Sequence, residues 1–341
     1  MSVSQVRIGI VGAGGIVKQR HLPALLAMPE VRIVAVCNSS LESSRRFCEE
    51  HVPGAEPMEH WPELICRDDV DVVWIGTTPY MHEEITCYAL RVGKHVFCQA
   101  RMAMNLAGAQ RMWEASLSYS DRVAALCPAP HGMKGGAFVK KLLAEGAIGA
   151  PHHVILNSLS SSWLDPDAPA HWRQKVEISG LQVLTFGIYV EVIQRWLGDI
   201  VAVLADGIVV HSERQGETIE VPDVLHVLCR FRNGALGNLT FSGVAAHPPQ
   251  DSLTIHGAEG TLTYNFVTDE IQLGKRGGAM ETLPIPPELV KEWTVERDFI
   301  RAVLDPTAPR PKPDFTEGTK YMRVVQAAAE SMDGGDLVRV A

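Results

Sequence analysis

The stretch that decides the fold runs Arg7-Ile8-Gly9-Ile10-Val11-Gly12-Ala13-Gly14-Gly15-Ile16-Val17. An apolar run typical of a β-strand ends there in a glycine-rich turn, and the turn opens into residues with helical spacing. This geometry presents backbone N–H groups to a pyrophosphate, although glycine-rich turns after strands also occur for steric reasons. We therefore expect a dinucleotide to be held by Gly12, Gly14, Gly15 and Ile16.

Length and composition indicate a folded protein of two domains. The 341 residues exceed what one hydrophobic core usually organises, and 46% of them are hydrophobic against 21% charged. Thirty-one basic and forty acidic residues give a net charge of −9 without a Lys/Arg-rich patch, so we expect no nucleic acid partner. No basic leader precedes an apolar segment and no apolar run reaches the length of a membrane span, so we expect no membrane partner and a cytoplasmic location.

The cysteines and histidines do not follow a metal-site pattern. Seven cysteines are scattered without a Cys-x-x-Cys pair, which indicates reduced thiols. His152 and His153 are adjacent, and neighbours on a strand point to opposite faces of a sheet. We expect no bound metal.

Strands alternate with helices over residues 1–127, which predicts a doubly wound parallel sheet. The second strand, residues 31–37, ends at Asn38, about twenty residues past the glycine turn, where dinucleotide folds read the adenosine ribose. A neutral Asn38 with Arg45 and Arg46 nearby does not repel a 2′-phosphate, so NADP is at least as plausible a cofactor as NAD. Alternatively, the two arginines form a solvated helix face.

Polar side chains also follow the strand predicted at residues 71–75 and the turn and strand predicted at residues 93–98. Because ligands gather at the carboxyl ends of parallel strands, these loops join the candidate cofactor site. Beyond the glycine turn, its residues are Asn38, Ser39, Arg45, Thr77, Thr78, Pro79, His82, Gln99 and Arg101.

From about Pro128 the pattern changes to successive strands with little helix between them. One long helix, at residues 180–197, interrupts the strands, and short turns join several of them. This half is therefore predicted to be α+β with a mostly antiparallel open sheet. Amphipathic helices are predicted at residues 295–304 and 318–331, and a proline-rich connection separates them.

The order and spacing of several motifs resemble the glucose-fructose oxidoreductase/inositol dehydrogenase (Gfo/Idh/MocA) family over nearly the whole chain. The motifs are Gly12-Ala13-Gly14-Gly15-Ile16, His21-Leu22-Pro23, Ala35-Val36-Cys37-Asn38, Thr77 to His82, Gly93-Lys94-His95-Val96, Gly146-Ala147-Ile148-Gly149 and Trp196-Leu197-Gly198. The resemblance implies a Rossmann domain at 1–127 that binds NADP or NAD, an α+β substrate and oligomerisation domain at 128–290, and C-terminal helices at 291–341 that pack back on the Rossmann domain. It also implies a small-molecule substrate such as a sugar or polyol, and a homodimer or homotetramer formed through the C-terminal sheet.

The chain departs from the family pattern at three positions that carry proton transfer in the family. Ala100 stands at the position of the usual lysine, Thr185 at that of an aspartate, and Tyr189 at that of a histidine. Thr185 and Tyr189 are expected to share one face of the long helix, because they are four residues apart.

Replacement groups are available for the missing acid and base. Tyr189 could exchange a proton if a cation stabilised its phenolate, and Arg101 is the first candidate for that cation, followed by Lys175 and Arg173. His171, on a loop that faces the cleft in the family, is a second candidate for acid/base work. In the alternative, Tyr189 simply fills the space of the former histidine.

Three functions remain open from the sequence. The first is an NAD(P)-dependent oxidoreductase with a non-standard acid/base set acting on a sugar-like or cyclic hydroxyl or carbonyl compound. The second is a non-catalytic nicotinamide-nucleotide-binding sensor or partner subunit. The third uses tightly bound NAD(P) transiently in elimination, epimerisation or glycoside cleavage.

Overall fold

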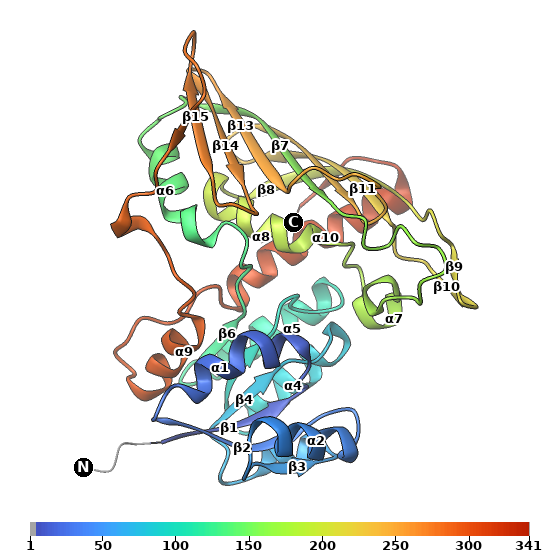
Figure 1. The fold of residues 1–341 in the computed structure, drawn as a ribbon, viewed down its shortest axis with the longest axis vertical. Helices are drawn as coiled ribbons and strands as arrows, with labels where there is room; N and C mark the ends of the chain where they lie inside the picture. Colours follow the sequence, from blue (N-terminus) through green and yellow to red (C-terminus); the bar gives the residue numbers. More distant parts are fainter. Residues whose placement is uncertain (1–4, 341) are drawn as a thin grey trace. The chain divides into compact units, whose positions relative to one another are not determined.

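The computed structural model describes residues 5–340. The chain forms two compact units, which are drawn in Figure 1. The first comprises the residues up to Pro128 together with Thr294–Thr319, and the second comprises Ala129–Trp293 together with the residues from Lys320 onward. The division into 1–127, 128–290 and 291–341 stays a prediction beside these two units.

The first unit is built on a sheet of six parallel strands in the order β3-β2-β1-β4-β5-β6. The strands are β1 (Val6–Val11), β2 (Val31–Cys37), β3 (Glu56–Met58), β4 (Val72–Ile75), β5 (His95–Cys98) and β6 (Ala124–Leu126). The chain runs outward from β1 to β3 and then resumes at β4 on the other side of β1. This confirms the predicted doubly wound fold and places the topological switch point, where such sheets bind ligands, between β1 and β4.

Helices connect these strands. They are α1 (Leu22–Leu26), α2 (Leu41–His51), α3 (Trp61–Cys66), α4 (Pro79–Arg91) and α5 (Leu106–Ser118), and a sixth helix, α9 (Val295–Leu304), joins the unit from much later in the chain. A π-helical turn, Val17–His21, leads from the glycine-rich turn into α1, which has Pro23 in its first turn, where the missing N–H of proline costs nothing.

An aromatic cluster ties α9 to the core of the first unit. Trp74 on β4 stacks on Phe97 of β5 with ring centroids 3.9 Å apart, and Phe299 of α9 packs edge-on against both rings at 5.7 and 5.5 Å. Beside them, His21 Nδ1 lies 2.5 Å from Glu296 Oε1, and both side chains are buried. The first unit is therefore completed by a segment almost three hundred residues from its start.

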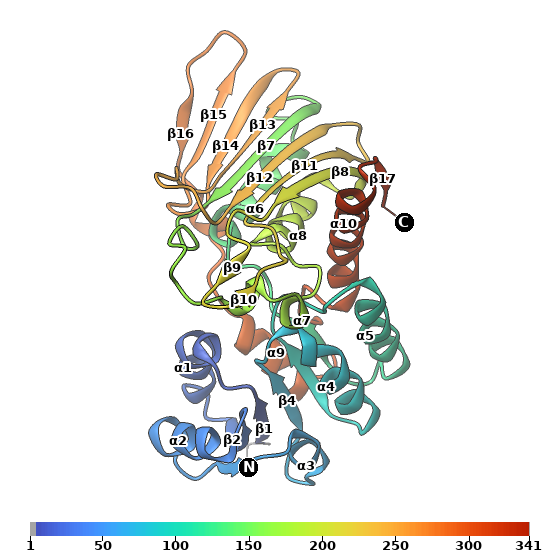
Figure 2. The ribbon, with the colours of Figure 1, turned by 90° about the vertical axis from the view of Figure 1, so that its right-hand side faces the viewer.

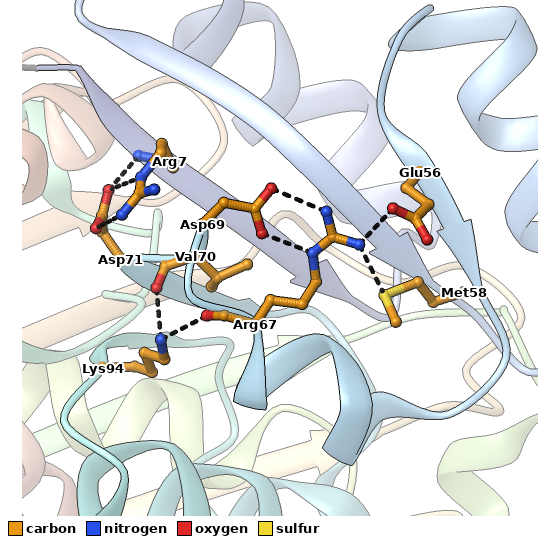
Figure 3. A network of polar contacts seen from close by, with 8 residues as sticks. All are labelled: Arg7, Glu56, Met58, Arg67, Asp69, Val70, Asp71 and Lys94. Carbon is orange, nitrogen blue, oxygen red and sulfur yellow. Dashed lines mark hydrogen bonds and ion pairs between the residues drawn. The ribbon is translucent and has the colours of Figure 1, made fainter.

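A polar network fixes the sheet edge near β3 (Figure 3). The guanidinium of Arg67 donates to Asp69 and Glu56 and contacts the Met58 sulfur at 3.9 Å. Lys94 Nζ donates to the carbonyl oxygens of Arg67 and Val70 at 2.8 and 2.7 Å. The short strand β3 is thus held by side chains as well as by its ladder to β2.

The second unit carries a nine-stranded sheet in the order β16-β15-β14-β13-β7-β12-β11-β8-β17. Its strands are β7 (Pro151–Leu159), β8 (Ile200–Ile208), β11 (Val224–Phe231), β12 (Leu236–Ser242), β13 (Ser252–Gly257), β14 (Gly260–Asn265), β15 (Ile271–Lys275), β16 (Glu281–Leu283) and β17 (Val338–Arg339). All neighbours are antiparallel except β7 and β12, which run parallel, so the predicted mostly antiparallel sheet is confirmed. Figure 2 shows its strands side by side.

The helices α6 (Met133–Ala144) and α8 (Phe186–Leu197) lie against one face of this sheet (Figure 1). The helix predicted over residues 180–197 begins only at Phe186. A short helix, α7 (Val176–Ser179), ends at Gly180, and positive φ angles at Gly180 and Leu184 break the chain between the two helices. Thr185 is consequently the N-terminal boundary residue of α8 and not an interior position.

Within residues 5–340, no helix combines the length and apolarity needed to traverse a bilayer. In the same residues, no group of three or more histidine, cysteine or acidic side chains is arranged to hold a metal ion. The seven cysteines are free thiols, most of them buried in the core.

Candidate cofactor cleft and polar cluster

A cleft of about 550 Å³ opens at the carboxyl ends of β1, β2 and β4 in the first unit. The predicted site residues Gly12, Gly14, Asn38, Thr77 and Thr78 are part of its wall. Its lining is Val11, Gly12, Ala13, Gly14, Cys37, Asn38, Ser39, Ser43, Glu59, Trp61, Gly76, Thr77, Thr78, Tyr80 and Met81.

The glycine-rich turn fits a dinucleotide by its shape. Gly12 has a φ of +84°, and a Cβ there would lie 2.6 Å from the backbone nitrogen of Thr77, so the two loops meet only because residue 12 is glycine. A Cβ at Gly14 or Gly15 would meet nothing within 4 Å, so this side of the turn is open to a ligand. The buried hydroxyl of Thr77 has no hydrogen-bond partner within the described chain and is available to such a ligand.

Asn38, at the expected ribose position, forms hydrogen bonds within the protein. Its Oδ1 accepts the backbone N–H of Ala13 at 2.7 Å, and its own N–H donates to Ser44 Oγ at 2.9 Å. Arg45, one residue further along α2, is exposed and does not line the cleft. The side chain predicted to read the ribose thus holds the glycine-rich turn in place.

His82 joins the loops that follow β4 and β5. Its ring nitrogens lie 2.9 Å from the carbonyl oxygens of Thr77 and Arg101, and burial lowers the pKa of this imidazole, which favours the neutral ring. Arg101 itself is buried, and Gln99 Oε1 lies 3.2 Å from His21 Nε2. His82, Gln99 and Arg101 therefore order the loops around the cleft rather than line it.

A polar cluster forms in the second unit around Asp251. Tyr189 donates its hydroxyl to Asp251 Oδ2 at 2.5 Å, and Ser158 Oγ donates to the same oxygen at 2.8 Å. The hydroxyls of Ser158 and Thr185 lie 2.9 Å apart, and the Leu159 N–H donates to Asp251 Oδ1 at 3.2 Å. Two of the predicted catalytic residues, Tyr189 and Thr185, thus belong to one network with a carboxylate.

Sequence reasoning missed Asp251 because its position depends on strand pairing. Asp251 directly precedes β13, and the register of β13 on β7 pairs Ser252 with Asn157, which brings Asp251 next to Ser158. Ninety-three residues separate Ser158 from Asp251, and no local motif marks the carboxylate. Only a correct prediction of this register would have found it.

The phenolate suggested for Tyr189 is not favoured. Its side chain is fully buried, and burial together with the hydrogen bond to Asp251 raises the pKa of the phenol well above its usual value. A carboxylate is the opposite of the cation that a phenolate needs. The structure thus gives the Tyr189 hydroxyl an acidic partner, and its acid/base role with Arg101, Lys175 or Arg173 stays a prediction.

The loop before α7 uses its polar residues locally. His171 Nδ1 accepts the N–H of Arg173 at 3.1 Å and caps the short helix Trp172–Gln174. The guanidinium of Arg173 lies 4.2 Å from the centre of the Trp172 ring, and Lys175 forms an ion pair with Glu217. The exposed His171 acts here as a helix cap, and its acid/base role stays a prediction.

Family models match both halves of the chain. Residues 6–126 match the model described as oxidoreductase family, NAD-binding Rossmann fold, and residues 137–263 match the GFO/IDH/MocA C-terminal domain. A dTDP-3,4-didehydro-2,6-dideoxy-alpha-D-glucose 3-reductase of Streptomyces antibioticus is 27% identical over 89% of this chain and 90% of that relative. A levoglucosan dehydrogenase of Pseudarthrobacter phenanthrenivorans is 26% identical over 80% of this chain and 76% of that relative.

The fold agrees with solved structures. A levoglucosan dehydrogenase in complex with NADH and levoglucosan superposes with a TM-score of 0.88 at 22% identity, covering 98% of this chain and 99% of that one. The cofactor of this Rossmann unit is a nicotinamide dinucleotide, NAD or NADP. With its two matching domain models in their expected order, the chain belongs to the GFO/IDH/MocA family of oxidoreductases.

Proposed function

We propose that the protein oxidises or reduces a sugar-like or cyclic hydroxyl or carbonyl compound, with Asp251 as the group that exchanges the proton. The observation that carries this proposal is the cluster of Tyr189, Ser158 and Thr185 around the Asp251 carboxylate. The relatives described above act on sugars according to their names, which supports the substrate class.

The cluster holds the carboxylate in one orientation. Two hydroxyls donate to Oδ2, whereas Oδ1 accepts one long hydrogen bond from a backbone N–H and keeps a further acceptor position. Asp251 is only half-buried. Tyr189 and Ser158 are positioning residues in this scheme.

A nicotinamide dinucleotide bound by the first unit would supply the hydride chemistry. In the direction of oxidation, Asp251 accepts the proton of the substrate hydroxyl while the C–O bond of the substrate becomes a carbonyl. In the direction of reduction, the protonated Asp251 returns that proton to the carbonyl oxygen. A carboxylate on the β13 side of the cluster thereby replaces the acid/base residues that the family carries where this chain has Ala100, Thr185 and Tyr189.

The test compares Asp251→Asn with Tyr264→Phe. Tyr264 is also fully buried and donates its hydroxyl to an aspartate, Asp269, at 2.5 Å, but it lies outside the cluster. With a panel of sugars, polyols and ketones, Asp251→Asn should lower kcat by about 10²–10⁴-fold, and Tyr264→Phe should leave kcat unchanged. Both variants should bind the dinucleotide as the wild type does.

Each other outcome has a meaning. Turnover by Asp251→Asn within a few-fold of the wild type would remove Asp251 from the chemistry. Dinucleotide binding without turnover of any panel compound would favour the sensor or partner-subunit function. A dinucleotide that co-purifies and does not exchange would favour transient use of the cofactor in elimination, epimerisation or glycoside cleavage.

We also propose that the second unit associates through the open face of its sheet into a homodimer or homotetramer. Leu204 and Ile208 on β8, Leu228 on β11 and Leu236 on β12 are 36–57% exposed, and Leu204 pairs directly with Leu228. Clustered apolar side chains of this kind are uncommon on the surface of a monomer. Light scattering should show at least a dimer at micromolar concentration and dissociation in Leu228→Lys, whereas a monomeric wild type would refute this association.

A further inference from the structure

The cofactor cleft contains an unusual distribution of charge. Among its fifteen lining residues, all of which the structure describes, Glu59 is the single charged side chain. The candidate phosphate-binding arginines, Arg45 and Arg46, are exposed on α2 and do not line the cleft. A ligand that enters this cleft therefore meets one carboxylate and no cation from its lining.

Strand register places Glu59 beside the ribose position. Cys37 at the end of β2 pairs with Met58 at the end of β3, so the next residues, Asn38 and Glu59, leave the sheet together at one edge. Ser44 Oγ joins the two strand ends, because it accepts the Asn38 N–H at 2.9 Å and donates to the Met58 carbonyl at 2.8 Å.

The end of β3 is fixed on its other side as well. Arg67 pairs with Glu56 and contacts the Met58 sulfur, as Figure 3 shows. Glu59 therefore projects from an anchored strand end into the wall of the cleft.

The chemistry of this position separates the two dinucleotides. Dinucleotide folds read the adenosine ribose at the end of the second strand, where an acidic group accepts from the free 2′-hydroxyl of NAD. Asn38 already accepts from Ala13 through its side-chain oxygen, whereas the Glu59 carboxylate is an acceptor in the cleft wall. The 2′-phosphate of NADP would bring close to two negative charges to that carboxylate.

We propose that the protein binds NAD in preference to NADP and that Glu59 is the residue responsible for this selection. Repulsion between the Glu59 carboxylate and the 2′-phosphate opposes the binding of NADPH, so NADH should bind about 100-fold more tightly than NADPH. The inference rests on the dinucleotide site alone and not on the proposed proton transfer at Asp251.

The test is an equilibrium titration of the full-length protein with NADH and NADPH, followed by the fluorescence of the dihydronicotinamide, which both ligands share. Glu59→Gln should lower the ratio of the NADPH dissociation constant to the NADH dissociation constant about tenfold or more. NADPH should bind more tightly because the repulsion of its 2′-phosphate is removed, and NADH more weakly because the charged acceptor of its 2′-hydroxyl is lost. Glu49→Gln is the matched control: it removes an exposed carboxylate of α2 that does not line the cleft, and it should leave the ratio of the two dissociation constants unchanged.

Equal binding of the two ligands, tighter binding of NADPH, binding of neither, or an unchanged ratio in Glu59→Gln would each overturn the proposal. Glu59 is exposed, so its replacement should not disturb folding. Raising the salt concentration should weaken the preference in the wild type more than in Glu59→Gln, because screening acts on the like-charge contact.

Discussion

Replacing Tyr189 by phenylalanine removes one hydrogen bond and leaves the packing of the ring intact. The side chain is fully buried, so water does not take the place of the lost hydroxyl, and the ring keeps its contact with Phe266 at a centroid distance of 4.9 Å. Asp251 retains Ser158 and the Leu159 N–H as donors. A hydrogen bond to a charged group contributes about 1.5–3 kcal/mol, so we expect Tyr189→Phe to lower the free energy of unfolding by about 2 kcal/mol.

The assay is urea unfolding of Tyr189→Phe, Asp251→Ala and the double variant, because alanine leaves no side-chain acceptor for the tyrosine hydroxyl. The free energies of unfolding are compared among variants that share the same m value. If the hydrogen bond carries the effect, the double-mutant cycle gives a coupling energy of about 1.5 kcal/mol or more. Tyr264→Phe, which loses the matching bond to Asp269 and also the acceptor of the Gly135 N–H, provides the control: its effect should be at least as large and independent of Asp251→Ala. A coupling between Tyr189 and Asp251 below about 0.5 kcal/mol, the usual error of additivity, would refute the reasoning.

Three further predictions concern the first unit. Gly12→Ala should destabilise the unit and abolish dinucleotide binding, because the new Cβ would lie 2.6 Å from the loop at Thr77. Gly14→Ala should keep the thermal stability and weaken only dinucleotide binding, because its Cβ would meet no protein atom within 4 Å. Thermal unfolding and a titration with the dinucleotide measure the two effects. Burial lowers the pKa of His95 to about 4. Between about pH 6.5 and 4 this imidazole is therefore protonated in the unfolded chain and still neutral in the folded chain. Stability should therefore fall by up to about 2 kcal/mol as the pH drops through this range, and His95→Gln should flatten the profile in denaturant titrations at each pH. Glu296→Ala should cost about 3 kcal/mol or more by leaving His21 without its buried carboxylate, and a variant as stable as the wild type would contradict a structural role for the pair.

The fold followed from local patterns, because apolar strands, glycine-rich turns and amphipathic helices are properties of short segments. The turn at Gly12 and the loop at Thr77 were predicted as parts of one site, and the structure brings them into direct contact. Local patterns did not reveal the start of α8 at Phe186, because positive φ angles at Gly180 and Leu184 interrupt residues with helical spacing.

The charged residues of both sites could not be predicted for a different reason. Glu59 is placed by the register of β3 on β2, and Asp251 by the register of β13 on β7. A shift of one residue in either ladder would turn these side chains to the other side of the sheet, and nothing near them in the sequence specifies the register. The chemistry of this chain thus depends on pairings that are long-range in sequence.

The return of α9 to the first unit also has a consequence for synthesis on the ribosome. Trp74 and Phe97 acquire their Phe299 neighbour only after some two hundred further residues have been made, which takes on the order of 10–40 s at ordinary elongation rates. Throughout that interval the first unit of the nascent chain has an open aromatic face, and most of the second unit, residues 129–293, is synthesised before the first unit is closed. Fragments that end near Pro128 should therefore aggregate, and chaperone dependence should concentrate in this window of translation.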